Sequence, residues 1–158
     1  MKTLLKLSSW QLFVILFTPF MISSTVSFLL PNMYFFLSNI WIVFYLIWIY
    51  AISTNLYNNL ESNKSSTWFS IFQVLALSTM ISFLFIPIST TLHIWAPIKT
   101  IIYIFSGVGL LFSIVYCART LTLSEKNQSS LFLNLILLWF YPIGLWIIQP
   151  KMKTLIKK

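Results

Sequence analysis

Carboxylates, imidazoles and thiols carry much of protein chemistry, and this chain has few of them. It contains two glutamates, Glu61 and Glu125, one histidine, His93, and one cysteine, Cys117. Each glutamate stands near a lysine in a polar stretch, and His93 has no second metal ligand close in sequence. An active site in a membrane needs paired acids, metal ligands, or a nucleophile beside a base. The sequence therefore predicts a protein that is not an enzyme and that holds no cofactor and no metal.

Two amide side chains, Gln73 and Asn134, lie inside apolar stretches. An amide in a bilayer needs a hydrogen-bond partner, and such a bond between helices contributes about 0.6 to 2 kcal/mol. Two interpretations follow. The amides either join helices or line a polar path in an oligomer.

The overall composition indicates a membrane protein. Of 158 residues, 59% are hydrophobic and 8% are charged, whereas about a quarter of a soluble domain is charged. The net charge of +8 is scattered between apolar segments, so it forms no continuous face for nucleic acid. A single cysteine excludes an intramolecular disulfide.

The apolar segments predict an all-α, polytopic membrane helix bundle in a single domain. We expect four clear transmembrane helices and a fifth, C-terminal apolar helix that is broken near Pro142 and Gly144, because proline lacks an N–H and glycine lacks a stiffening side chain. Pro87 should end the third helix. The expected segments are 10–30, 33–56, 67–88, 98–121 and 131–149, followed by a basic tail at 150–158.

Small residues line one side of the fourth segment. Gly109, Ser113 and Cys117 are spaced four apart, and Ser106 extends the line. This spacing allows another helix to approach closely, where van der Waals packing drives association in lipid. We expect a helix-packing face here.

Aromatic residues recur at intervals of seven in the second and fifth segments. The second has Tyr34, Trp41 and Trp48, and the fifth has Trp139 and Trp146. Such a repeat keeps one helix face against a partner. A groove for a quinone or lipid tail is the alternative, and helix packing is favoured.

The distribution of Lys and Arg bears on topology. With a cytoplasmic N-terminus, five full crossings place five of these cations inside and five outside. If the last segment re-enters instead, the count becomes nine against one. Positive residues prefer the cytoplasmic side, so the charges favour a cytoplasmic C-terminus. The cations counted are Lys2, Lys6, Lys64, Arg119 and Lys126, then Lys99, Lys151, Lys153, Lys157 and Lys158.

Two motifs resemble a known group of proteins. The chain closes with Trp-Phe-Tyr-Pro-Ile-Gly-Leu-Trp-Ile-Ile-Gln-Pro-Lys, at 139–151, and opens with Lys-Leu-Ser-Ser-Trp-Gln-Leu-Phe, at 6–13. Both are similar to the terminal segments of small integral membrane proteins of Bacteroidetes, which end in a Pro-Ile-Gly-x-Trp-x-x-Gln-Pro-Lys/Arg run. The resemblance implies a membrane protein and brings no activity or cofactor with it.

These observations favour a small non-catalytic protein of the inner (cytoplasmic) membrane, multi-pass, that acts through helix–helix contacts as an accessory subunit, assembly factor or immunity-type factor. The expected partners are the lipid bilayer and either another membrane protein or further copies of this chain. The alternatives are an oligomeric small transporter or channel and, third, a charge-poor organelle-encoded respiratory subunit.

Overall fold

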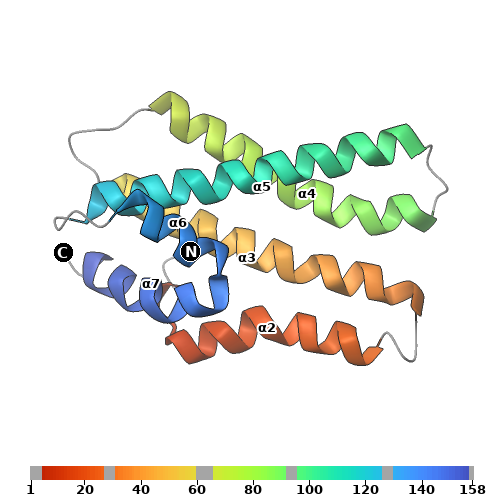
Figure 1. The fold of residues 1–158 in the computed structure, drawn as a ribbon, viewed down its shortest axis with the longest axis horizontal. Coiled ribbons are helices and arrows are strands. Elements are labelled where there is room, and N and C mark those ends of the chain that lie inside the picture. Colours follow the sequence, from red (N-terminus) through yellow and green to blue (C-terminus); the bar gives the residue numbers. More distant parts are fainter. Residues whose placement is uncertain (1–4, 27–30, 60–65, 92–95, 126–129, 157–158) are drawn as a thin grey trace.

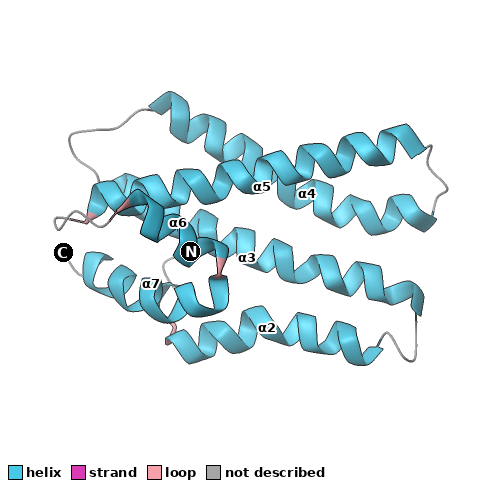
Figure 2. Ribbon diagram, viewed as in Figure 1, coloured by secondary structure: helices cyan, strands magenta, loops and turns pink. Residues whose placement is uncertain are grey.

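The computed structural model describes residues 5–26, 31–59, 66–91, 96–125 and 130–156. In these ranges the only regular secondary structure is helix (Figure 2). The helices are α2 (Ser9–Val26), α3 (Pro31–Asn59), α4 (Ser66–Thr91), α5 (Ala96–Ser124), α6 (Leu131–Trp139) and α7 (Tyr141–Ile156).

Three helices contain segments long and apolar enough to cross a membrane, and these segments are Asn39–Asn58, Thr67–Phe85 and Ala96–Ser124. A shorter apolar segment, Ser9–Ser23, lies in α2. The prediction of an all-α chain is confirmed for the described residues, and the three long helices suit a membrane protein.

The four helices α2 to α5 lie lengthwise, and each runs opposite to the one before it (Figure 1). α3 packs against α2, α4 and α5, and α4 packs against α5. Because connections between sequential antiparallel helices are short, this up-and-down order is the simplest one for the sequence.

The last two helices form a hairpin that does not cross the bundle. α6 lies against α5 and ends part of the way along it, after which α7 returns to the end where α6 began (Figure 1). α7 also packs against α2 and α3. We call α6 and α7 the C-terminal hairpin and Trp139 with Phe140 its tip. The end of the bundle that holds the start of α2, the end of α5 and the end of α7 is the mouth end.

The predicted break in the fifth segment exists, two residues before Pro142, and the chain turns back there. The helix stops at Phe140, whose φ and ψ are −89° and 60°, and Pro142 falls in the first turn of α7, where its missing N–H costs little. The last helix extends beyond the predicted end at 149, because α7 continues through Pro150 and the first part of the basic tail to Ile156.

One other proline does not act as expected. Pro87 does not end the third helix, since α4 runs on to Thr91. Pro31 is the first residue of α3, where its fixed φ suits a helix start. The second helix, α3, is longer than the predicted 33–56, and the fourth, α5, is longer than the predicted 98–121.

Large side chains fill the centre of the bundle. Trp48 and Phe72 are fully buried, and Leu121 and Leu138 pack into the same cluster. The core joins α3, α4 and α5 to the hairpin. The hairpin is therefore a part of the fold and not an appendage.

Candidate functional site: the C-terminal hairpin

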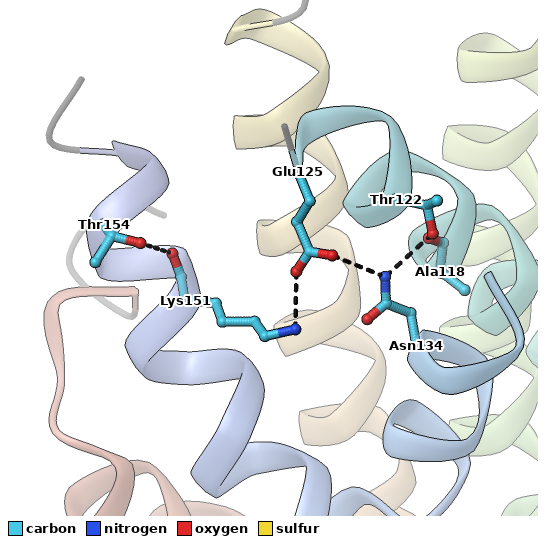
Figure 3. A network of polar contacts seen from close by, with 6 residues as sticks. All are labelled: Ala118, Thr122, Glu125, Asn134, Lys151 and Thr154. Atoms are coloured by element: carbon cyan, nitrogen blue, oxygen red, sulfur yellow. Dashed lines mark hydrogen bonds and ion pairs between the residues drawn. The ribbon is translucent and has the colours of Figure 1, made fainter. Parts of the chain in front are cut away.

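A polar network holds the hairpin on α5 at the mouth end (Figure 3). Lys151 Nζ lies 2.9 Å from Glu125 Oε1. Asn134 Nδ2 donates to Thr122 Oγ1 at 3.1 Å and, at 3.5 Å, to Glu125 Oε2. The Glu125 side chain is 11% exposed and that of Lys151 is 34% exposed. A carboxylate this buried requires a cation and hydrogen bonds, and both come from the hairpin.

Gln149 forms a second junction, between α7, α3 and the residues that precede α2. Its Oε1 accepts a hydrogen bond from Trp48 Nε1 at 3.2 Å. Its Nε2 donates to the carbonyl oxygens of Leu5 at 3.0 Å and Leu7 at 3.1 Å. One buried amide thus joins three parts of the chain that are far apart in sequence.

Two features, a hydrogen bond from Tyr45 and a close approach at Gly144, stabilise the turn at the tip. Proline at 142 leaves the carbonyl of Leu138 without its helical N–H partner, and the Tyr45 hydroxyl donates to that oxygen at 2.5 Å. A Cβ built on Gly144 would lie 1.6 Å from the Leu137 carbonyl oxygen. Only glycine allows α7 to pass so close to the end of α6.

The outer face of the hairpin is aromatic and exposed. Trp139, at the tip, is 57% exposed. Phe132, Phe140 and Trp146 are exposed as well. Within the described residues, nothing accepts a hydrogen bond from the Trp139 indole. Of the aromatic line predicted for the fifth segment, Trp139 points away from the bundle, whereas Trp146 lies beside Trp10 and Phe13 of α2.

The aromatic line predicted for the second helix points inward. Trp48 is buried, and Trp41 stacks on Tyr141 of α7 with ring centroids 5.5 Å apart. The side chain of Tyr34 lies outside the described residues. The two predicted lines consequently have different environments, and only that of α3 meets the hairpin.

The small residues predicted as a packing face all lie inside the bundle. Ser106, Gly109, Ser113 and Cys117 are buried. A Cβ on Gly109 would lie 1.9 Å from Thr79 Oγ1 of α4, so the two helices touch at this point. This face is occupied within the chain and does not offer a surface to another protein.

Of the two predicted intramembrane amides, each meets a protein partner. Gln73 Nε2 lies 3.3 Å from the Tyr50 hydroxyl of α3, and Asn134 belongs to the network at the mouth end. They are not brought together. Gln73 joins α4 to α3, whereas Asn134 joins α6 to the end of α5.

Among the described residues, the side chains that could act in catalysis or bind a metal lie apart from one another. Among the described residues no group of three His, Cys, Asp or Glu could hold a metal ion, and Cys117 is buried. Glu61 and His93 lie outside the described residues. The arrangement around Glu125 is suited to holding two helices together.

Sequence reasoning did not single out Gln149, Tyr45 or the Glu125–Lys151 pair as site residues. A signal existed for the first, because a glutamine among the apolar residues Ile147 and Ile148 must find partners. The ion pair had a weaker signal, which is that Glu125 is one of only two acids in a strongly basic chain. Neither signal names the partner.

No family model, no curated protein and no solved structure matches this chain. The resemblance to the Bacteroidetes membrane proteins stays a prediction.

Proposed function

We propose that this is a small non-catalytic protein of the inner membrane that binds another membrane protein through the outer face of its C-terminal hairpin. The observation that carries the proposal is the exposed tip formed by Trp139 and Phe140. An accessory subunit, an assembly factor and an immunity-type factor would all use such a face.

The proposed topology has four crossings, by α2 to α5, and a hairpin that re-enters from the cytoplasmic side. Helix α5 has 29 residues and so a length of about 43 Å, whereas the 9 residues of α6 extend about 13 Å. A hydrocarbon core is about 30 Å thick. The tip of the hairpin then lies inside the core, roughly 7 to 13 Å below its cytoplasmic boundary, and both termini are cytoplasmic.

The charges support this orientation. With the mouth end inside, nine of the ten Lys and Arg are cytoplasmic and Lys99 alone is outside. That is the arrangement preferred by the positive-inside rule. Re-entrant backbone also needs satisfied polar groups, and Tyr45 meets this need at Leu138.

The depth of the tip supports a protein partner over lipid. Tryptophan prefers the membrane interface, where its N–H reaches water. Inside the core the Trp139 indole has no water, and no described residue accepts its proton. An unpaired donor in an apolar medium costs free energy. A partner helix that presents a hydrogen-bond acceptor at this depth would remove that cost.

An oligomeric transporter or channel is the second candidate, and the interior of this chain gives it less support. Trp48 and Phe72 fill the described centre, and Gln73 and Asn134 bond to neighbouring helices. A pore would have to form between copies.

Photo-crosslinking in the native membrane tests the proposed contact. A photoreactive phenylalanine derivative replaces Trp139 in one variant and, as a matched control, Val74 of α4, which is also exposed. We expect one protein adduct of defined mass from position 139 and none from position 74. Diffuse adducts of equal yield from both positions would contradict the proposal.

A reconstituted flux assay separates the two candidates. Purified protein in vesicles should conduct no ions or solutes. Flux through the protein alone would replace the accessory role by the transporter role.

A further inference from the structure

Two lysines from opposite ends of the chain flank the seam between α7 and the residues that lead into α2, where Gln149 holds the two parts together. Gln149 Nε2 bonds to the carbonyl oxygens of Leu5 and Leu7, at 3.0 and 3.1 Å, so Lys6 lies between two anchored carbonyls. Lys153 follows Gln149 by four residues in α7 and therefore shares its face, one turn further on. Figure 1 shows the start of α2 beside α7.

These two lysines carry uncompensated charge. The ion pair of Lys151 with Glu125 is at the same end of the bundle, but neither Lys6 nor Lys153 forms an ion pair with any residue that the structure describes. Lys6 is exposed and Lys153 is half-buried. Two cations that flank one junction between parts of the chain are complementary to an anionic group.

An exposed aromatic pair lies along the same seam, toward the bundle centre. The rings of Trp10 in α2 and Trp146 in α7 have centroids 6.3 Å apart, and Phe13 lies 6.4 Å from Trp146. Trp10 is 60% and Trp146 is 48% exposed. Tryptophan rings near the cytoplasmic end of a transmembrane bundle suit the boundary between lipid headgroups and acyl chains.

We propose that the seam of α2 and α7 is a binding site for an anionic phospholipid. The phosphate of the lipid lies at Lys6 and Lys153, and the part of an acyl chain nearest the headgroup lies on Trp10 and Trp146. Basic pockets between helices on the cytoplasmic side recognise acidic headgroups in this way. The inference rests on membrane placement and does not require a protein partner at Trp139.

Quenching of tryptophan fluorescence by brominated lipids tests the site in the full-length protein. The protein is placed in nanodiscs that contain increasing fractions of dibrominated phosphatidylglycerol or dibrominated phosphatidylcholine. We expect stronger quenching by the glycerol lipid at equal mole fraction. Replacing Trp10 and Trp146 by phenylalanine should remove most of this excess, since the reporters are then gone.

Charge variants show whether the lysines cause the preference. K6Q and K153Q should each lower the apparent affinity for phosphatidylglycerol about five-fold, and the double variant should abolish the excess. K6R/K153R should retain it, and so should K99Q, at the opposite end of the bundle. Equal quenching by both lipids, or an excess that survives K6Q/K153Q, would overturn the proposal.

Competition distinguishes a lipid from a free anion. Inorganic phosphate, added at an ionic strength matched with chloride, should leave the excess quenching unchanged because it lacks acyl chains. If it displaces the lipid more than chloride does, the site binds phosphate and not phospholipid. The lipid measurements do not depend on the proposed protein contact, so a failure to crosslink a partner at Trp139 would leave their outcome unchanged.

Discussion

At the scale of single residues, the hairpin depends on Gly144. Its position against the Leu137 carbonyl leaves no room for a side chain, and a backbone atom cannot rotate away. Gly107 offers a matched comparison, because a Cβ there would meet nothing within 4 Å.

We expect Gly144→Ala to lower stability by about 1–3 kcal/mol, the usual cost of overpacking, and Gly107→Ala to change it little. Both changes in stability are measured as thermal midpoints in detergent, with the folded fraction monitored by size-exclusion chromatography with fluorescence detection. Equal midpoints for the two variants would show that α7 does not pass Leu137 as described.

Gln149 is the second residue on which the fold depends. Gln149→Leu keeps the size but leaves the Trp48 indole and two carbonyls without this partner. Each buried group left unpaired costs about 1–3 kcal/mol. The thermal midpoint of Gln149→Leu should therefore lie well below that of wild type. Gln73→Leu, which loses one contact with Tyr50, should lower the midpoint less. A larger loss for Gln73→Leu would contradict this ranking.

At the scale of elements, the Glu125–Lys151 pair is one of the connections between the hairpin and the end of α5. The Glu125 side chain is largely buried but that of Lys151 is 34% exposed, so solvent screens the pair in part and its contribution should be near that of a surface pair. Its value lies in where it places α7, opposite the end of α5.

A double-mutant cycle measures this connection. Glu125→Lys should destabilise the protein because it puts two cations together, and the addition of Lys151→Glu should restore part of the loss. We expect a coupling free energy of about 0.2–1 kcal/mol that decreases as salt is raised. Additive effects of the two substitutions would mean that the pair does not form.

At the scale of the whole molecule, the proposed re-entry of the hairpin predicts a cytoplasmic C-terminus. A reporter fluorescent only in the cytoplasm, fused after residue 158, should be bright. The same reporter fused after residue 95, between α4 and α5, should be dark. Alkaline phosphatase at the same two positions should give the opposite pattern. An active phosphatase at residue 158 would show that the last segment crosses fully.

The sequence alone determined the helical class and the membrane character, because both follow from composition and from the length of uninterrupted apolar segments. It also located a break in the fifth segment, since Pro142 and Gly144 act on the backbone locally. Charge counting favoured a re-entrant segment, but it could not show which contacts hold the last two helices against the bundle.

Only the tertiary structure decided which faces are used inside the chain and which are left outside. The small-residue face of α5 is buried, with Gly109 against Thr79 of α4, and Trp139 is exposed, although both patterns predicted helix packing. Gln149 and Glu125 found partners on distant helices. Periodicity shows that a helix has a distinct face, but the neighbour of that face is set by how all helices pack together, which no local pattern contains.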